Sequence, residues 1–210
     1  MELSVSILNS KDRKKDINKL ISNNKVNYIH YDVMDGIFVN DIEFNTNELE
    51  DLFKIKNKNK DIHLMVKNPK EYIKFLVNYD VSYITIHSEI DNVEKYINMI
   101  KKSGKKVGLA VNPDTLIKDI EKYLDKVDLI LIMSVHPGLG GQKFIDASVD
   151  KIRELKSIID KNNYNIKIEV DGGVNNTNSN LLRCIGVDII VVGSFITKSD
   201  NFNKQIDILM

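Results

Sequence analysis

Residues 106–133, KVGLAVNPDTLIKDIEKYLDKVDLILIM, contain one complete strand–helix–strand unit. Lys106–Val111 and Leu129–Met133 are short apolar runs rich in branched side chains, which is typical of buried parallel strands. Between them, residues 115–124 repeat apolar positions with the period of an amphipathic helix. Parallel neighbours need such a crossover, so this stretch predicts a β-α-β arrangement.

The same pattern recurs along the whole chain. Further strands are expected at Leu3–Leu8, Tyr28–Val33, Ile62–Val66, Tyr83–Ile86, Ile166–Val170 and Ile189–Val192. Further helices are expected at 11–22, 46–56, 69–79, 92–103, 147–161, 177–184 and 201–209. Three of these helices have the cap-to-acid spacing of a capping box at their start, in Asn45 to Glu48, Asn68-Pro69-Lys70-Glu71 and Asp91 to Glu94.

Eight such units in 210 residues leave about 26 residues per unit, which fits a compact (β/α)8 TIM barrel. The competing arrangement is an open doubly wound sheet, whose first turn is usually rich in glycine. Here that turn is Asn9-Ser10-Lys11-Asp12, which has no glycine. No linker or change of composition divides the chain. We therefore expect an α/β fold with a single (β/α)8 barrel domain over residues 1–210.

The composition argues against several classes of function. The 30 Lys and Arg equal the 30 Asp and Glu, so the chain lacks the basic character of a nucleic-acid-binding protein. The charge runs Lys56–Lys60 and Lys101–Lys106 are expected to be solvated helix ends or turns. No apolar run approaches the roughly 20 residues of a membrane span, and the first residues do not resemble a signal peptide. We expect a cytoplasmic protein with no nucleic-acid or membrane partner.

The single cysteine, Cys184, rules out a disulfide framework and a zinc site built from cysteines. It lies in a predicted helix, where we expect it to be a small buried apolar residue.

Polar residues at strand ends are informative, because a TIM barrel forms its active site at the C-terminal ends of its strands. All four histidines fall at predicted strand ends. His30 and Asp32 are two residues apart in one strand, so their side chains point to the same side. If that side is the interior, they can meet His63 and Asp171 from two other strands. Two imidazoles and two carboxylates can form the inner shell of a divalent metal ion.

The other histidines and three methionines have simpler interpretations. For His87 and His136, each considered alone, we expect a hydrogen-bonded structural role. Met34, Met65 and Met133 lie at or just beyond strand ends. They could merely fill gaps in the core, or they could exclude water from a metal–carboxylate centre.

Three glycine-containing segments follow the last three predicted strands. Pro137-Gly138-Leu139-Gly140-Gly141-Gln142 is expected to be a mobile loop whose backbone approaches a ligand. Asp171-Gly172-Gly173-Val174 and Gly193-Ser194 follow the seventh and eighth strands, where this fold usually binds phosphate. The sequence therefore favours a phosphorylated small-molecule ligand.

Seven stretches occur in a characteristic order: Ser6-Ile7-Leu8, Tyr28–Gly36, His63-Leu64-Met65, Gly108 to Pro113, Met133–Phe144, Glu169–Val174 and Gly193-Ser194. In this order they resemble the ribulose-phosphate 3-epimerase family, nearly from end to end. The resemblance implies a ribulose-phosphate-binding TIM barrel and an isomerase of the pentose phosphate pathway, in carbohydrate metabolism. Such an enzyme interconverts D-ribulose 5-phosphate and D-xylulose 5-phosphate.

The resemblance also implies roles for individual residues. His30, Asp32, His63 and Asp171 would hold one divalent metal ion per subunit, with Zn²⁺ or Fe²⁺ preferred and Mn²⁺ or Co²⁺ also acceptable. Asp32 and Asp171 would be the two acid/base catalytic groups of an enediolate mechanism. The substrate would be bound by Ser6, His63, Gly138, Leu139, Gly140, Gly141, Asp171, Gly172, Gly173, Gly193 and Ser194. The implied assembly is a homo-oligomer, either a dimer or a hexamer.

Four departures from the family pattern concern the segments around the site. Val5 stands where proline is usual, and Ile37–Asp41 replaces a Phe-Val-Pro-Asn segment. Leu139 stands where phenylalanine is usual, and His136 where asparagine is common. Because these positions bear on loop packing and sugar fit, a 3-epimerase for another ketose phosphate, such as allulose 6-phosphate, remains an alternative.

Two further alternatives keep the barrel and change its function. A metal-free phosphate-binding lyase or decarboxylase would not need His30, Asp32 and His63 to converge. A sugar-phosphate sensor that had lost catalysis would not need both Asp32 and Asp171, and both are present.

Overall fold

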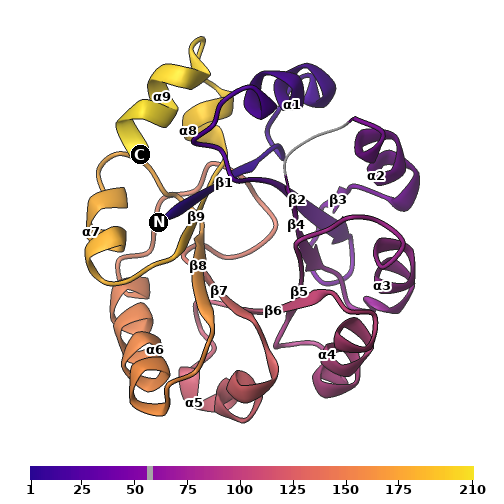
Figure 1. Cartoon of the computed structure of the whole chain (residues 1–210), viewed down its shortest axis with the longest axis vertical. Coiled ribbons are helices and arrows are strands. Elements are labelled where there is room, and N and C mark those ends of the chain that lie inside the picture. Colours follow the sequence, from indigo (N-terminus) through magenta and orange to yellow (C-terminus); the bar gives the residue numbers. More distant parts are fainter. Residues whose placement is uncertain (56–58) are drawn as a thin grey trace.

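The computed structural model describes residues 1–55 and 59–210. Within them, parallel strands form a closed barrel, because the first strand pairs with both the second and the last. The barrel strands are β1 (Glu2–Ser6), β2 (Tyr28–Asp35), β4 (Asn59–Met65), β5 (Tyr83–His87), β6 (Lys106–Val111), β7 (Leu129–Met133), β8 (Lys167–Asp171) and β9 (Ile189–Val192). The predicted (β/α)8 barrel is confirmed (Figure 1).

Helices cover the outside of the barrel (Figure 1). They are α1 (Arg13–Ile21), α2 (Thr46–Phe53), α3 (Lys70–Leu76), α4 (Val93–Lys102), α5 (Ile117–Ile120), the 3-10 helix η1 (Glu121–Lys126), α6 (Ser148–Asn162), α7 (Ser179–Cys184), α8 (Ser194–Thr197) and α9 (Phe202–Leu209). The helix expected at 46–56 ends at Phe53, and residue 56 lies outside the described residues. The helix expected at 115–124 is divided between α5 and η1, and the sequence does not predict α8.

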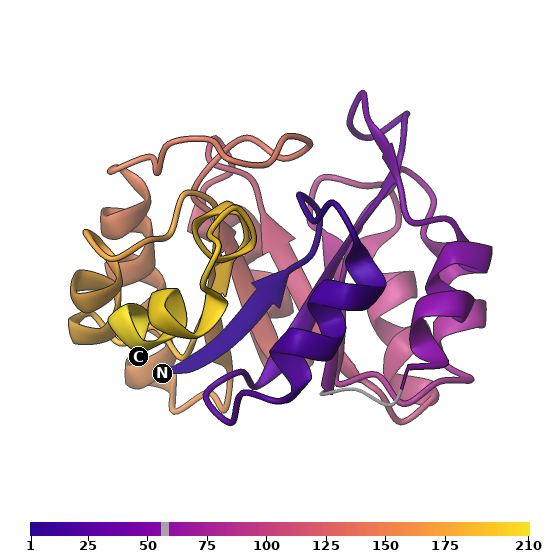
Figure 2. The same ribbon diagram turned by 90° about the horizontal axis from the view of Figure 1, so that it is seen from above.

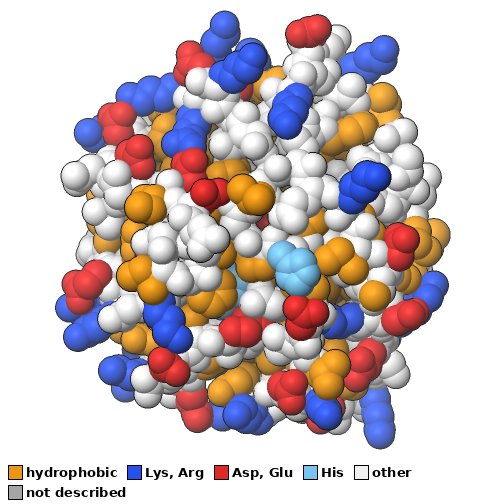
Figure 3. All heavy atoms as spheres, turned by 180° about the vertical axis from the view of Figure 1, so that it is seen from behind, with side chains coloured by type: hydrophobic (Ala, Val, Ile, Leu, Met, Phe, Trp, Pro, Cys, Tyr) orange, Lys and Arg blue, Asp and Glu red, His pale blue; other side chains and the backbone are white. Residues whose placement is uncertain are grey.

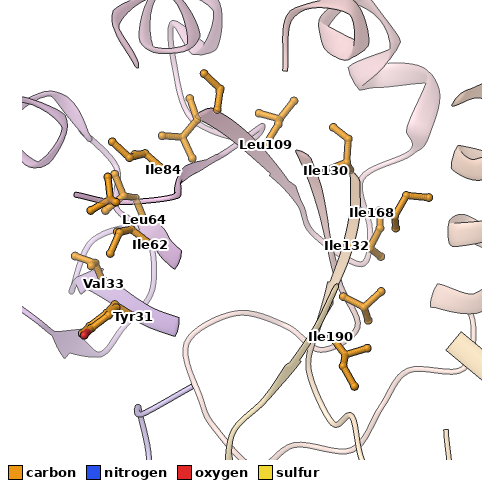
Figure 4. Close-up of a cluster of buried hydrophobic side chains, with 14 of the residues drawn as sticks. Tyr31, Val33, Ile62, Leu64, Ile84, Leu109, Ile130, Ile132, Ile168 and Ile190 are labelled. Carbon is orange, nitrogen blue, oxygen red and sulfur yellow. The ribbon is translucent and has the colours of Figure 1, made fainter. Parts of the chain in front are cut away.

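The main apolar core lies between the strands and the helices (Figure 4). Along β4, Ile62 and Leu64 point outward into this core. Asp61 and His63 alternate with them and therefore face the barrel interior. A second apolar cluster fills the interior with Tyr28, Tyr83, Ala110, Leu129, Leu131, Met133, Val135 and Ile189. Burying each such large side chain contributes about 1.5–3 kcal/mol to stability, which gives the polar interior residues a rigid support.

A short antiparallel strand, β3 (Ile42–Glu43), pairs with the end of β2 and extends above the barrel mouth (Figure 2). β2 itself runs two residues beyond the predicted end at Val33. The turn is held by Asp35 Oδ1, which accepts hydrogen bonds from the N–H groups of Ile37 at 2.9 Å and Phe38 at 2.8 Å. The sequence does not predict this hairpin, which lies beside the mouth of the barrel.

One of the three predicted capping boxes is present. Asn45 and Glu48 cap α2 reciprocally. At α3, Asn68 Oδ1 instead accepts hydrogen bonds from the Tyr96 hydroxyl at 3.0 Å and from Lys70 N at 3.3 Å, and no side chain caps the helix in a capping box. At α4, Asn92 occupies the cap position with a left-handed φ of 59°. The capping boxes predicted at these two helices are therefore wrong.

Two smaller predictions are also wrong. Cys184 is exposed at the end of α7. Lys60 is not part of a solvated turn: it belongs to β4 and is buried, while residues 56–58 lie outside the described residues.

The outer surface shows no single dominant charge. Acidic and basic side chains are intermixed on the face seen in Figure 3, in keeping with a formal net charge of zero. Among the described residues, no helix is long and apolar enough to cross a bilayer.

Candidate active site

Four predicted site residues meet inside the barrel. His30 and Asp32 come from β2, His63 from β4, and Asp171 from the last position of β8. One nitrogen or oxygen atom from each side chain lies within 4.8 Å of the corresponding atoms of the others. Asp32 Oδ1 lies 3.3 Å from both His30 Nε2 and His63 Nδ1. Asp171 Oδ2 lies 3.9 Å from the same two nitrogens.

Strand alternation and register explain why these side chains converge. His30 and Asp32 are two residues apart, so both face the interior. His63 is the direct register partner of Asp32 on the neighbouring strand β4. Asp171 is the partner of Met133 on β7 and approaches from the other side of the barrel. The two histidines lie within the strands rather than beyond their ends, which places them beneath the mouth.

The His30 ring is oriented from below by a buried acid. Its Nδ1 lies 2.7 Å from Asp61 Oδ2, and the same oxygen accepts a hydrogen bond from Ser4 Oγ at 2.8 Å. The other ring nitrogen, Nε2, is buried and has no hydrogen-bond partner. An orphaned imidazole nitrogen that faces two carboxylates fits a cation, so this donor set suits the divalent metal that the sequence predicts.

The His63 ring is held from behind by a second histidine. His63 Nε2 lies 2.8 Å from His87 Nε2, and His87 Nδ1 lies 3.0 Å from Glu89 Oε2. Both rings are fully buried. His87 therefore adjoins the site instead of serving only a local structural role. His136, in contrast, is exposed and 3.8 Å from Asp114, away from the four-residue cluster.

The two carboxylates of the cluster have opposite electrostatic environments. Burial and the negative charge of Asp32 raise the pKa of Asp171 to about 7. Burial acts in the same direction on Asp32, but the charge of the neighbouring His30 and the hydrogen bond with His63 outweigh it and hold the pKa of Asp32 far below its usual range. Near neutral pH, Asp32 is therefore ionised while Asp171 exchanges a proton readily. Such a pair is suited to base and acid roles.

A second pair of buried acids lies beneath the cluster. Asp61 and Glu169 are both fully buried, and each is two residues before a predicted ligand on the same strand. Burial and the charge of Asp61 raise the pKa of Glu169 well above its usual value.

The sequence patterns assign no role to Asp61, Glu169 or Glu89, and only a structural role to His87. The sequence does contain a signal for Asp61 and Glu169. A charged residue that alternates with apolar residues in a buried strand must face the interior and needs a partner there.

A pocket lies directly above the cluster. Ser6, Asp32 and Asp171 line it, and Ser6 Oγ donates a hydrogen bond to Asp32 Oδ2 at 2.7 Å. The other predicted substrate-binding residues in its wall are Gly138, Leu139, Gly140, Gly141, Gly172, Gly173, Gly193 and Ser194. His63 lies below the wall and does not line this pocket.

The methionines form part of the same pocket wall. Met34, Met65 and Met133 are almost fully buried and all line it. Their position favours the interpretation that they exclude water from the cluster, in addition to filling space.

Two glycines are required by the backbone at the pocket rim. Gly173 has a φ of 64°, and a Cβ atom there would stand 2.3 Å from the backbone nitrogen of Phe144. Gly172 has a φ of 125°, and a Cβ atom there would stand 2.6 Å from a methyl carbon of Val135. Only glycine allows this loop to pack so closely against Val135 and Phe144.

The chain resembles known proteins over most of its length. The sequence model of the ribulose-phosphate 3 epimerase family matches residues 2–197. A ribulose-phosphate 3-epimerase of Buchnera aphidicola subsp. Baizongia pistaciae is 46% identical over 182 residues, covering 85% of this chain and 80% of the relative. One of Helicobacter pylori is 35% identical over 208 residues, covering 99% and 95%. One of Escherichia coli strain K12 is 37% identical over 181 residues, covering 85% and 80%.

Solved structures of more distant proteins share the fold. The 3-hexulose-6-phosphate synthase of Salmonella typhimurium superposes with a TM-score of 0.74 at 17% identity, covering 100% of this chain and 96% of that one. A tryptophan synthase α-subunit of Pyrococcus furiosus superposes with a TM-score of 0.73 at 14% identity, with the same coverage. At such identities the likeness concerns the barrel alone.

Proposed function

Because the chain belongs to the ribulose-phosphate 3-epimerase family, we propose that its site interconverts D-ribulose 5-phosphate and D-xylulose 5-phosphate, with Asp32 and Asp171 as the acid/base pair. The observation that supports this most strongly is the pair of carboxyl groups from β2 and β8. They lie in one pocket and their pKa values are displaced in opposite directions. An isomerase that moves a proton from one face of a carbon to the other needs such a pair.

The reaction inverts C3, next to the C2 carbonyl. One carboxylate removes the C3 proton, the electrons of the C–H bond form a C2–C3 double bond, and the π electrons of the C2 carbonyl move onto its oxygen, which gives an enediolate. The other carboxylic acid then returns a proton to C3 on the opposite face. One base reaches only one face, so two groups are needed. Ionised Asp32 is suited to removing the proton, and Asp171, whose carboxyl group gains and loses a proton near neutral pH, is suited to returning one; the two roles exchange in the reverse direction.

The enediolate carries negative charge that the site must meet with preorganised positive charge. We propose that His30, Asp32, His63 and Asp171 hold one divalent cation. A cation held there would act as a Lewis acid toward the developing oxyanion. Two imidazole nitrogens and two carboxylate oxygens suit Zn²⁺ or Fe²⁺ best, with Mn²⁺ and Co²⁺ as further candidates.

The pocket wall supplies protection from water. The buried Met34, Met65 and Met133 surround the carboxylates with apolar surface, which strengthens every charge interaction inside. The 138–141 loop lies over the pocket and Gln142 braces it, because Gln142 Nε2 donates hydrogen bonds to His136 O at 2.7 Å and Leu139 O at 2.8 Å. We propose that this loop closes over the substrate.

We propose that the phosphate group binds at the rim, against the backbone of Gly173, Gly193 and Ser194. These residues line the pocket next to Asp171, and Gly193, which follows β9, packs against Ser6 on the neighbouring strand β1. A dianion at this edge places the sugar chain across the cluster, so that C2 and C3 come to lie between Asp32 and Asp171. The remaining expectations, a cytoplasmic location and a homo-oligomer, stay predictions that fractionation and light scattering can test.

The test is a coupled assay of the purified protein on ribulose 5-phosphate, allulose 6-phosphate and 3-hexulose 6-phosphate. We expect xylulose 5-phosphate formation, with a kcat/KM higher than that for allulose 6-phosphate. A chelator should abolish the activity and a divalent cation should restore it. Full activity in a protein shown by elemental analysis to hold no metal would overturn the metal centre. Absence of epimerase activity with cleavage of 3-hexulose 6-phosphate would overturn the proposed function.

A further inference from the structure

Three side chains in contact, His63, His87 and Glu89, lead from the cluster to a residue just beyond the end of β5. His63 Nε2 faces His87 Nε2 at 2.8 Å, and His87 Nδ1 faces Glu89 Oε2 at 3.0 Å. His63 and His87 are completely buried, and the two rings are stacked with centroids 4.9 Å apart. Phe38 covers the His87 ring with centroids 4.5 Å apart, so neither ring has room to turn freely.

Glu89 is fixed as a hydrogen-bond acceptor. Its Oε1 accepts a hydrogen bond from Asn112 N at 2.9 Å and another from Thr115 Oγ1 at 2.6 Å. These donors leave Oε2 to face His87. A carboxylate only accepts, so the hydrogen of a neutral His87 belongs on Nδ1.

The tautomer of His87 then determines which ring nitrogen of His63 carries the hydrogen. With its hydrogen on Nδ1, His87 presents the lone pair of Nε2 to His63. His63 can satisfy that lone pair only by placing its own hydrogen on Nε2, which leaves the Nδ1 lone pair directed toward Asp32 and Asp171. Asp32 Oδ1, 3.3 Å from Nδ1, favours a hydrogen on Nδ1 in the absence of a cation. Glu89, acting through His87, favours the hydrogen of His63 on Nε2 instead.

We propose that Glu89 is a positioning residue that acts through His87 to keep the Nδ1 lone pair of His63 available to a divalent cation. The proposal deepens the proposed function, since it rests on the metal centre inferred there. Asp61 orients His30 in the same way through a direct contact with His30 Nδ1, whereas Glu89 acts on His63 through the His87 ring between them. The outer partner of a metal-binding histidine commonly sets its tautomer in this way.

The variant Glu89→Gln tests the proposal, because it keeps the shape and removes the second acceptor oxygen. If the glutamine oxygen accepts the hydrogen bonds from Asn112 N and Thr115 Oγ1, its NH₂ group faces His87. Because an NH₂ group only donates, His87 Nδ1 must then accept, and the His87 hydrogen moves to Nε2. Two N–H groups then oppose each other at the His63–His87 contact. We expect zinc affinity, measured by competition with a chromophoric chelator, to fall by about 10- to 100-fold.

The second readout does not depend on activity. ¹⁵N NMR of histidine-labelled, zinc-loaded protein should show hydrogen on Nδ1 of His87 in the wild type and on Nε2 in Glu89→Gln. The matched control is Glu94→Gln, which alters an exposed glutamate on α4 that pairs with Lys126. The control should change neither readout. Wild-type zinc affinity together with a wild-type His87 spectrum in Glu89→Gln would overturn the proposal.

A pair of His87 variants covers the case in which Glu89→Gln does not fold. In His87→Gln, the amide oxygen can accept from His63 while the amide nitrogen donates to Glu89, so zinc affinity should stay within about three-fold of the wild type. His87→Leu removes the acceptor and should lose affinity. Equal zinc affinity in these two variants would overturn the proposal. A wild type that binds no zinc would refute the metal centre itself, whereas zinc binding by the wild type, with unchanged affinity and an unchanged His87 spectrum in Glu89→Gln, would refute only the role of Glu89.

Discussion

Asp32 and His63 are direct neighbours across β2 and β4, with Asp32 Oδ1 3.3 Å from His63 Nδ1. This contact joins the two parts of the site. Asp32 also accepts a hydrogen bond from the Ser6 hydroxyl at the pocket floor. On its other side, His63 contacts His87, which in turn contacts Glu89. A carboxylate that lines the pocket is thus in contact with a chain of side chains that do not line it.

Replacing Asp171 by asparagine should abolish epimerisation and leave the fold intact. Asparagine has nearly the same shape but cannot exchange a proton with C3, so kcat should fall by about 10³-fold or more. The coupled assay measures the loss, and circular dichroism checks the fold. Asp207→Asn, at an exposed partner of Lys25 on α9, is the control and should be fully active. Near-normal turnover in Asp171→Asn would refute the two-carboxylate scheme.

Replacing Asp32 by asparagine should remove both activity and metal binding. Asp32 contacts both histidines of the cluster, so its charge supports the whole donor set. Metal content after dialysis, measured by elemental analysis, should fall well below one ion per chain in this variant. A variant that keeps a full complement of metal would show that Asp32 is not a ligand.

Metal binding should release protons and become tighter as pH rises from 6 to 8. In the metal-free protein the pKa of Asp171 is about 7, because burial and the charge of Asp32 raise it. Burial opposes a charge on His30, but the carboxylates of Asp32 and Asp61 raise its pKa well above the usual value. A cation must displace these protons, so affinity should gain about tenfold or more per pH unit below pH 7.

Isothermal titration of the metal-free protein, in buffers of different ionisation enthalpy, counts the protons released. An affinity that does not change between pH 6 and 8, with no proton release, would contradict the electrostatics described for the cluster.

The contribution of Glu89 to stability should be lost in acid. Burial opposes its ionisation, but hydrogen bonds and charge from His87, with donors Thr115 and Asn112, lower the pKa of Glu89 from 4.5 to about 2. A carboxyl group with a lowered folded-state pKa stabilises the fold above its unfolded pKa, and this stabilisation disappears as pH falls from about 4.5 through 2.

The wild type should therefore lose more stability than Glu89→Gln between pH 5 and pH 2. The expected difference is of the order of 2–3 kcal/mol. Urea unfolding at a series of pH values measures it. Parallel losses in the two proteins would show that Glu89 is not held as a carboxylate by its neighbours.

Gln142→Ala should impair the loop over the pocket. Its side chain braces the loop through hydrogen bonds to His136 O and Leu139 O. Losing both should reduce kcat/KM by about tenfold, while the free energy of unfolding stays within about 0.5 kcal/mol of the wild type. Gln205→Ala on α9, remote from the pocket, is the control. Unchanged kinetics in Gln142→Ala would show that this bracing is not needed for turnover.

The barrel could be predicted from the sequence because its strands are short runs rich in apolar, branched side chains and recur with helical segments between them. Tertiary contacts determine the features that were missed. Asn68 does not form the expected capping box because its oxygen also accepts a hydrogen bond from the Tyr96 hydroxyl of the neighbouring helix α4. β3 exists only because β2 continues to Asp35, whose carboxylate folds the following turn.

The four clustered residues could be predicted from alternation and from their positions on the strands. The residues behind them could not. Glu89 lies two positions after His87 in a segment with no motif, and its importance depends on the 2.8 Å contact between His87 and His63. That contact follows from the register of β4 with β5, which a single strand pattern does not specify.

The most direct test of the account is an NMR measurement of deuterium at C3 after incubation of ribulose 5-phosphate with the wild type and Asp171→Asn in D₂O. If Asp32 removes the C3 proton and Asp171 returns one from the other face, the wild type should form xylulose 5-phosphate with solvent deuterium at C3. Asp171→Asn should form almost none. Wild-type product without deuterium at C3, or deuterated xylulose 5-phosphate from Asp171→Asn at the wild-type rate, would contradict the two-carboxylate mechanism.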